Sequence, residues 1–268
     1  MHGLAMRFLG HSTVRMEMAG HVVLTDPLLT RGVGPLRRFG PVPTAADRTG
    51  VDLVLLSHLH GDHLHLPSLR LLPRGARVVV PRGAGTWLRH KGIPGVEELA
   101  PGEELVHGDL RVTGVEAAHS GHRWGPRSTH GPQARAMGHL LETSDVRVYA
   151  TGDTDLFDGM ADLPPVDVAL VPVWGWGPSL GPGHLTPDRA ARAVDVLRPR
   201  VAVPVHWGTL AVAGLTRVPG GPGERMRRLL VEPPREFADA VAATGGPTHV
   251  VVTAPGERVA LPSTPARP

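Results

Sequence analysis

The sequence predicts a mixed α/β fold. Short apolar runs such as 51–56, 166–173 and 201–205 are bounded by Gly, Pro or Asp, which is typical of buried strands. The segment after Thr186 has a good N-cap residue, Pro at the first helical position and apolar residues at helical spacing as far as Pro199. Apolar residues make up 41% of the chain, which is enough for a substantial core.

The length and composition favour one domain. A chain of 268 residues exceeds the average domain, but large α/β domains reach this size. We therefore expect a single domain over residues 1–261 and a frayed tail over 262–268. The chain has no cysteine, so any metal site must use nitrogen and oxygen ligands. Residues 1–20 lack a signal-peptide pattern and no long apolar run follows, which predicts a cytoplasmic protein without a membrane anchor.

The charge balance identifies no partner and gives no support for nucleic-acid binding. Lys and Arg number 28 and Asp and Glu 25, for a net charge of +3. No run of five like charges occurs, so the sequence offers no basic stripe for nucleic acid. We expect a small-molecule substrate, for which a phosphorylated and an acylated compound are both open, and no nucleic acid. Whether the chain forms a homo-oligomer is a separate open question.

The N-terminal half is expected to be rich in strands. Strands are predicted at 6–9, 14–18, 21–25, 51–56 and 77–80, followed by a hairpin of 105–106 and 110–115. Short helices are predicted at 67–72 and 83–91. Residues 30–50 are rich in Gly, Pro and Arg and are expected to form a long loop.

The C-terminal half alternates strands with helices. Strands are predicted at 138–142, 146–150, 166–173 and 201–205, with helices from Thr186 to the residue before Pro199 and at 234–244. Residues 249–253 and 258–261 are expected to form a closing hairpin. Residues 123–137 show no periodicity and are expected to form a loop over a site.

The motif that organises the chain is Ser57-His58-Leu59-His60-Gly61-Asp62-His63-Leu64-His65, directly after a predicted buried strand. Imidazoles and a carboxylate at this density are typical of sites for Zn²⁺ and its first-row neighbours. Residues i and i+2 of an extended segment point the same way, so His58 and His60 can converge on one ion. Asp62 and His63, beyond the turn at Gly61, can face a second ion.

Residues that can bind metal also follow other predicted strands. They are His119, with His122 as the rival ligand, Asp153 in Thr151-Gly152-Asp153-Thr154-Asp155, and His206. Asp26 follows a strand before Pro27, and is either a turn former or a residue that supports a ligand histidine. His11 could support the ligands in the same way. Because active sites of open sheets gather at strand ends, this placement predicts one metal site.

Further residues are candidates for substrate contact. His184 precedes a helix N-terminus, where amide dipoles favour anions, so it either polarises the substrate or is structural. Trp124, Trp174 and Trp176 lie in loops beside the predicted site and form either an apolar wall for substrate or ordinary loop packing.

The motif order resembles the metallo-β-lactamase superfamily: His58-Leu59-His60-Gly61-Asp62-His63, then His119, Gly152-Asp153-Thr154 and His206-Trp207-Gly208-Thr209. Gly10-His11-Ser12-Thr13, Thr25-Asp26-Pro27 and His184-Leu185-Thr186-Pro187-Asp188 resemble, within it, the branch of N-acyl-phosphatidylethanolamine phospholipase D and ascorbate-6-phosphate lactonase-like proteins. This resemblance implies a four-layer αββα sandwich with two metals at one edge of the sheets. It also implies that His58, His60 and His119 hold one metal, that Asp62, His63 and His206 hold the other, and that Asp153 bridges them.

The resemblance implies a hydrolase with two divalent metal ions, Zn²⁺ by default, with Mn²⁺ or Fe²⁺ as alternatives. Metals about 3.5–4 Å apart can hold a bridging hydroxide that attacks an ester-type bond, such as a phosphodiester or lactone. Asp62 and His184 are then the candidate catalytic groups. An iron-dependent oxidoreductase and a non-catalytic metal-binding protein are the alternatives. The substrate, the native metal, the oligomeric state and the roles of His65, His122 and residues 123–137 stay open.

Overall fold

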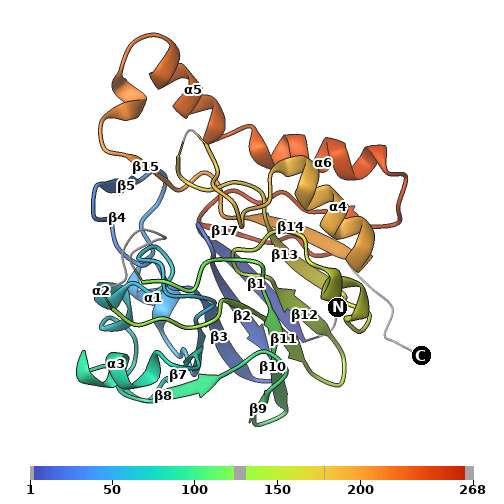
Figure 1. Cartoon of the computed structure of the whole chain (residues 1–268). Helices are drawn as coiled ribbons and strands as arrows, with labels where there is room; N and C mark the ends of the chain where they lie inside the picture. The colour runs from blue at the N-terminus through green and yellow to red at the C-terminus, as the bar shows by residue number, and fades with distance from the viewer. Residues whose placement is uncertain (1–2, 124–130, 178, 263–268) are drawn as a thin grey trace.

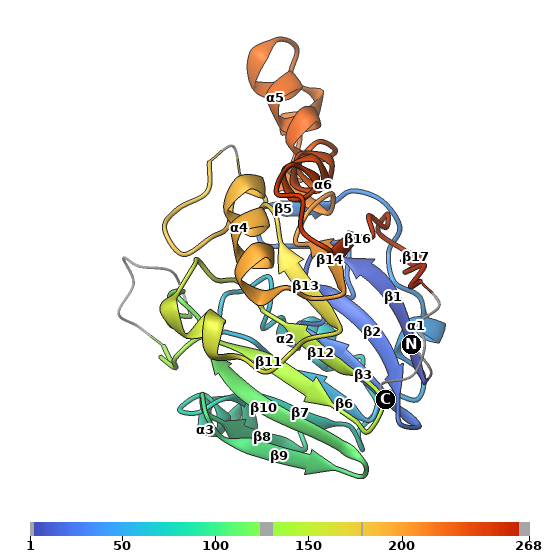
Figure 2. The same cartoon turned by 90° about the vertical axis from the view of Figure 1, so that its right-hand side faces the viewer.

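The computed structural model describes residues 3–123, 131–177 and 179–262. Within these residues, the strands form two seven-stranded sheets and a small three-stranded sheet (Figure 1). The two large sheets lie face to face, and helices lie outside them (Figure 2). The structure therefore confirms the four-layer αββα sandwich that the sequence predicts.

The first sheet has the strand order β17-β1-β2-β3-β6-β7-β8. Its strands are β1 (Leu4–Gly10), β2 (Thr13–Met18), β3 (His21–Thr25), β6 (Leu53–Leu55), β7 (Arg77–Pro81), β8 (Val96–Leu99) and β17 (Glu257–Arg258). β1, β2 and β3 are antiparallel neighbours, whereas β3, β6, β7 and β8 run parallel. Parallel strands end at the same edge of a sheet, so the segments after β3 and β6 are brought together.

The second sheet has the strand order β16-β14-β13-β12-β11-β10-β9. Its strands are β9 (Glu104–His107), β10 (Leu110–Glu116), β11 (Met137–Glu142), β12 (Arg147–Ala150), β13 (Val168–Pro172), β14 (Val201–Val205) and β16 (His249–Val250). β9 to β12 are antiparallel, which confirms the hairpin predicted at 105–115. β12, β13 and β14 are parallel, so their carboxyl ends also share one edge.

The remaining elements complete the layers. The small sheet contains β4 (Gly32–Val33), β5 (Leu36–Arg38) and β15 (Leu210–Val212). The helices are α1 (Ala45–Arg48), α2 (Leu66–Leu69), α3 (Gly85–His90), α4 (Pro187–Leu197), α5 (Gly221–Leu229) and α6 (Pro233–Ala243), with 3₁₀ turns η1 (Asp158–Asp162) and η2 (Leu215–Arg217). α4 begins at the predicted N-cap, where the hydroxyl of Thr186 accepts from the backbone N–H of Arg189.

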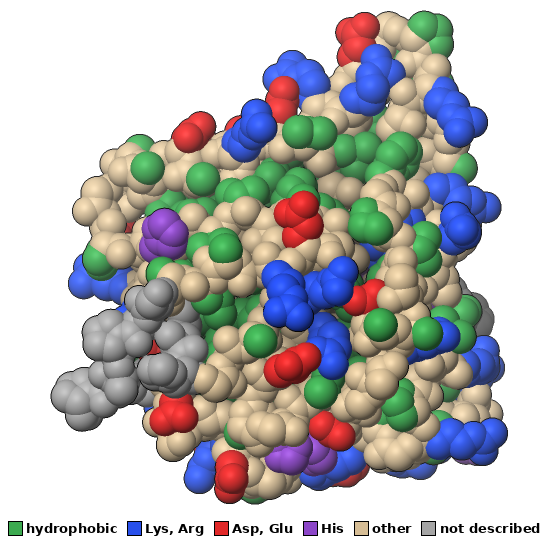
Figure 3. Space-filling view, turned by 180° about the vertical axis from the view of Figure 1, so that it is seen from behind, with side chains coloured by type: hydrophobic (Ala, Val, Ile, Leu, Met, Phe, Trp, Pro, Cys, Tyr) green, Lys and Arg blue, Asp and Glu red, His purple; other side chains and the backbone are tan. Residues whose placement is uncertain are grey.

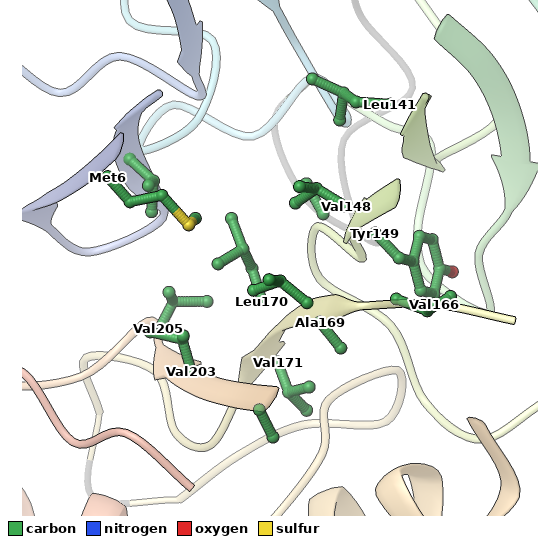
Figure 4. Packing of buried hydrophobic residues seen from close by; sticks show 14 of the residues in the cluster. Met6, Leu141, Val148, Tyr149, Val166, Ala169, Leu170, Val171, Val203 and Val205 are labelled. Atoms are coloured by element: carbon green, nitrogen blue, oxygen red, sulfur yellow. The ribbon is translucent and has the colours of Figure 1, made fainter. Parts of the chain in front are cut away.

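The core follows the alternation of side chains along each strand. On β6, Leu53 and Leu55 join the main core between the sheets, whereas Val54 joins a second cluster on the outer face. Figure 4 shows Leu170 of the second sheet pointing toward Met6 of the first. Full burial of one such side chain contributes about 1.5–3 kcal/mol to stability, so the two clusters hold the layers together.

The helices cover the outer faces of the sheets. α4 buries Val194 and Leu197, and α6 buries Phe237, in the same cluster as the second sheet. α3 buries Leu88 in the cluster on the outer face of the first sheet. α5 projects from the body of the molecule (Figures 1 and 2).

Two of the predicted segments are wrong. Residues 30–50 are not one long loop, because they contain β4, β5 and α1. Residues 249–253 and 258–261 do not form a hairpin: β16 pairs with β14 in the second sheet, whereas β17 pairs with β1 in the first. Each of these two short strands pairs with a strand distant in sequence instead of with its neighbour in the chain. The predicted tail, 262–268, lies outside the described residues apart from residue 262.

Acidic and basic side chains are interspersed on the face seen in Figure 3, as expected for a net charge of +3. Among the described residues, no helix combines the length and apolar character needed to cross a lipid bilayer.

Candidate metal centre

All seven predicted metal ligands come together at one edge of the sandwich, each placed by the end of a strand. The motif at 58–63 follows β6, His119 follows β10, Asp153 follows β12 and His206 follows β14. His11 lies in the turn between β1 and β2, and Asp26 directly follows β3. Strand ends from both sheets therefore build the centre.

The first group of candidate ligands is His58, His60 and His119. Nδ1 of His60 lies 3.0 Å from Nε2 of His58 and 3.1 Å from Nε2 of His119. Nitrogens on a tetrahedral Zn²⁺ at the usual bond length are about 3.3–3.4 Å apart. The spacing of these three nitrogens therefore fits a single ion.

The second group is Asp62, His63 and His206, joined by His11. Nε2 of His63 lies 3.1 Å from Nε2 of His206. Nε2 of His11 lies 3.0 Å from Oδ2 of Asp62, so His11 contacts a candidate ligand directly. These nitrogen and oxygen atoms are also close enough together to bind one ion.

Asp153 lies between the two groups. Its Oδ2 is 3.3 Å from Nε2 of His63 and 3.3 Å from Nε2 of His206, and it also approaches His58 and His119. Its Oδ1 is buried and has no hydrogen-bond partner in the described structure. A buried carboxylate oxygen without a partner is costly, and a cation would compensate it.

Hydrogen bonds to backbone carbonyls fix the tautomers of two ligands. Nδ1 of His119 donates to the carbonyl of Gly183 at 2.7 Å. Nδ1 of His206 donates to the carbonyl of Trp174 at 2.5 Å. Since a carbonyl only accepts, each imidazole must carry its proton on Nδ1, which leaves Nε2 with a lone pair for a metal.

Asp26 fixes two more tautomers. Its Oδ2 accepts from Nδ1 of His63 at 2.9 Å and from the hydroxyl of Ser57 at 2.7 Å. The hydroxyl of Ser57, whose own proton is used on Asp26, accepts from Nδ1 of His58 at 2.9 Å. One carboxylate thus orients a histidine in each ligand group, with Nε2 directed toward the centre.

The backbone at the centre is strained. His11, Asp26 and His206 have φ angles of 57°, 33° and 62°, in the left-handed region that non-glycine residues seldom adopt. Each such residue costs about 1–2 kcal/mol. Backbone outliers of this kind cluster at functional sites, where the surrounding structure holds them in place.

Burial keeps most of these imidazoles neutral. It lowers the pKa of His60 to about 4 and also lowers the pKa values of His58, His119 and His206. Burial alone would lower the pKa of His63 too, but the carboxylates of Asp153 and Asp26 outweigh it and raise that pKa. A ligand imidazole must be unprotonated, so the neutral rings suit a metal site.

The two carboxylates of the centre stay ionised. Burial would raise the pKa of Asp62, but the hydrogen bond from His11 and the nearby imidazoles lower it strongly. Burial would likewise raise the pKa of Asp153, and the charges of His206 and His63 lower it instead. Both groups can therefore bind a cation at neutral pH.

His184 contacts the centre from the segment before α4. Its Nε2 lies 3.5 Å from Oδ2 of Asp153, and its ring packs edge-on against His119. Burial would lower the pKa of His184, but its hydrogen bond and charge interaction with Asp153 raise it above the usual value. The side chain of His184 is partly exposed.

The predicted tryptophans occupy different positions. Trp174 is buried in the main core, and its backbone carbonyl accepts a hydrogen bond from His206. Trp176 is 40% exposed, and its contact with substrate stays a prediction. Trp124 and most of the loop predicted at 123–137 lie outside the described residues.

His65 and His122 lie outside the groups of candidate ligands. Nδ1 of His65 contacts the hydroxyl of Ser68 at the start of α2. His122 lies in an isolated bridge with Gln133. No role was predicted for Ser57 from the sequence, although a hydroxyl at the junction of a buried strand and the first histidine of the motif was the available signal.

Another His and Asp group lies at the opposite end of the sandwich. His21 at the start of β3, Asp52 before β6 and His107 at the end of β9 approach one another. Arg77 donates to Nδ1 of His107 at 2.9 Å and pairs with Glu97. This group therefore belongs to an ion network that links the two sheets.

Comparison with known proteins agrees with this fold. The model of the β-lactamase superfamily domain matches residues 21–207. An uncharacterized protein of Mycobacterium tuberculosis is 33% identical over 96% of this chain and 68% of its own length. A protein of Symbiobacterium thermophilum named a UPF0173 metal-dependent hydrolase is 29% identical over 96% of this chain and all of its own length. Igni18, a metallo hydrolase of Ignicoccus hospitalis, has a similar structure, with a TM-score of 0.70, 24% identity and coverage of 96% and 97% of the two chains.

The αββα sandwich and the histidines and aspartates at its edge define a protein of the metallo-β-lactamase fold. The match over residues 21–207 covers more than half of the chain, so this protein belongs to the β-lactamase superfamily domain family.

Proposed function

We propose that this protein is a metal-dependent hydrolase with two metal ions, acting on an ester-type bond of a small molecule such as a phosphodiester or a lactone. The observation that carries the proposal is the pair of ligand groups with Asp153 between them, close to members of both. The name of the Symbiobacterium relative supports metal-dependent hydrolysis. The motifs around His11, Asp26 and His184 support a place near the phospholipase D and lactonase-like branch.

The residues present fit divalent metals. His58, His60 and His119 would hold one ion, Asp62, His63 and His206 the other, and Asp153 would contact both. Zn²⁺ is the default for this nitrogen and oxygen set, and Mn²⁺ or Fe²⁺ can use it too. Two such ions supply a nucleophile from water at neutral pH and stabilise negative charge on the attacked group.

The protein's own groups would orient the reaction. Asp26 holds the rings of His63 and, through Ser57, His58. His11 holds the carboxylate of Asp62. His184, with its raised pKa and partial exposure, would carry a proton beside Asp153 and donate it to developing negative charge on the substrate.

A substrate screen with controlled metal loading tests this proposal. Protein stripped with a chelator and reloaded with Zn²⁺ or Mn²⁺ should hydrolyse at least one of a lactone, a phosphodiester and a simple aryl ester. Activity should vanish on stripping and in Asp62→Ala, but persist in the exposed control Asp145→Asn. Hydrolysis that survives both chelation and Asp62→Ala would contradict the proposal.

A further inference from the structure

A small cavity lies between the two sheets, directly beneath the candidate metal centre. Ser12, Asp26 and Ser57 line it from the first sheet, and His139, Thr151 and Gly152 line it from the second. The space open to the centre of a water molecule is about 10 Å³. This volume is about that needed for a single water.

Two of the residues that line this cavity, one from each sheet, carry a buried polar atom without a hydrogen-bond partner in the described structure. Oγ of Ser12, in the turn between β1 and β2, and Nε2 of His139, on β11, make no hydrogen bond within the described structure. Both side chains are more than nine-tenths buried, with 6% and 2% of the residue exposed. Leaving such a group unsatisfied costs about 1–3 kcal/mol, so two of them facing one cavity call for a ligand.

Asp26 offers a third contact in the same cavity. Its Oδ2 accepts from His63 and from the hydroxyl of Ser57, whereas its Oδ1 accepts from the backbone N–H of Ser57 at 2.7 Å. A carboxylate oxygen can accept more than one hydrogen bond, so Oδ1 keeps capacity for another donor.

We propose that one internal water binds in this cavity between Ser12, His139 and Asp26, and that His139 acts through it as a positioning residue for Asp26. A buried water typically makes about three hydrogen bonds to otherwise unsatisfied groups, which matches the three partners here. The hydroxyl of Ser12 and a neutral imidazole can each donate or accept, and the water donates to the carboxylate.

The state of His139 agrees with this role. Burial lowers its pKa to about 4, although the carboxylate of Asp26 acts in the opposite direction. The ring is therefore neutral at pH 7 and binds a neutral molecule. A charged imidazole would instead compete with His63 and Ser57 for the carboxylate.

The functional consequence rests on the proposed metal centre. Asp26 orients His63 directly and His58 through Ser57. A water bound to Asp26 would therefore help to orient one histidine in each ligand group. Thr151 and Gly152, which also line the cavity, lead into Asp153. The cavity thus lies under both the orienting carboxylate and the shared one.

A crystal structure of the protein at high resolution tests the water itself, with or without metal. We expect one ordered water within hydrogen-bond distance of Ser12 Oγ, His139 Nε2 and Asp26 Oδ1. His139→Phe should remove it, because the apolar ring offers no partner. A cavity without density in the wild-type crystal would overturn the proposal.

Metal affinity, measured by competition with a chelator, tests the positioning role. Loss of a group that orients a metal-binding histidine weakens metal affinity by about 10–100-fold. His139 acts one step further away, so we expect His139→Phe and Ser12→Ala to weaken Zn²⁺ binding measurably, toward the lower end of this range at about 10-fold. His139→Gln keeps a polar group and should recover most of the affinity. A merely structural role would lower the melting temperature of the metal-free variants without changing their affinity.

The outcomes separate this proposal from the proposed function. If the water is present but the affinity of His139→Phe equals that of the wild type, the positioning role is wrong. If the wild-type protein binds no metal, the metal centre fails together with the positioning role, whereas the bound water is still decided by the crystal structure.

Discussion

The carboxylate of Asp26 accepts a hydrogen bond of 2.9 Å from Nδ1 of His63, and both side chains are almost completely buried. This contact leaves Nε2 of His63 free to face His206 and Asp153. The same carboxylate accepts from Ser57, which in turn accepts from His58. Asp26, which is not itself a candidate ligand, therefore sets the orientation of the candidate ligands His58 and His63.

Asp26→Asn should weaken metal binding strongly while the fold persists. The amide has the size of the carboxylate, but in either orientation its NH₂ group faces a donor. That donor is the backbone N–H of Ser57 in one orientation, and Nδ1 of His63 with the Ser57 hydroxyl in the other. We expect a loss of about 10–100-fold in Zn²⁺ affinity by chelator competition. Asp145→Asn, at an exposed turn, is the matched control and should leave the affinity unchanged. Equal affinities in the two variants would show that Asp26 does not orient the ligands.

His184→Gln should lower turnover without removing metal. His184 forms a further candidate metal group with His119 and Asp153, but its partly exposed ring is placed before α4, and we expect it to transfer a proton to a substrate rather than to hold metal. We expect kcat to fall about 100-fold or more, with metal content maintained. The exposed His90 on α3 gives the control His90→Gln. A loss of metal in proportion to activity would make His184 a ligand instead.

Stability should fall as the pH is lowered, in part through His139. The pKa of this histidine is about 4 in the folded protein, below its usual 6.5, because of burial. Between these values the unfolded chain binds a proton that the folded protein does not, so stability falls as the pH drops and levels off below about 4. The full shift corresponds to roughly 3 kcal/mol.

Denaturant unfolding of the metal-free protein at pH 7 and pH 4.5 measures this effect. His60 and His65, whose pKa values burial also lowers to about 4, contribute in the same direction in every variant. The comparison with His139→Phe isolates one residue, and this variant should lose less stability between the two pH values. Identical losses would contradict the low pKa of His139.

Gly152→Ala should disturb both stability and metal content. Gly152 has φ +63°, and an added Cβ would lie 2.5 Å from Cβ of Ser57. Gly102 has φ +85° with no atom near its would-be Cβ, so Gly102→Ala carries only the backbone cost of about 1–2 kcal/mol. We expect Gly152→Ala to cost a further 1–3 kcal/mol or so from the clash and to lose metal, because Asp153 and Ser57 move. Thermal unfolding and metal analysis of both variants check this; equal effects would refute the clash.

Local patterns were sufficient to predict the strands that carry the site. The apolar run at 51–56 and the motif that follows it are contiguous, and so are the strand and ligand at 201–206. Parallel pairing then brings these ends to one edge. The grouping of His58 with His119 and of His63 with His206 came from the family resemblance, because their spatial contact is not encoded locally.

Other features depend on contacts between distant parts of the chain. β16 and β17 are two-residue strands whose partners lie in different sheets, so no local signal distinguishes them from a hairpin. His139 and Ser12 look like ordinary strand and turn residues in the sequence. Their meaning comes only from the packing of one sheet on the other, which buries both beside Asp26.

The metal content of the protein purified without added metal tests the central claim most directly. Elemental mass spectrometry should find close to two Zn or Mn per chain in the wild type, with a clear fall in Asp153→Ala and none in Asp145→Asn. Stoichiometric iron would favour the alternative of an iron-dependent oxidoreductase. A protein that holds no metal as purified and takes up none when Zn²⁺, Mn²⁺ or Fe²⁺ is added would contradict the metal centre.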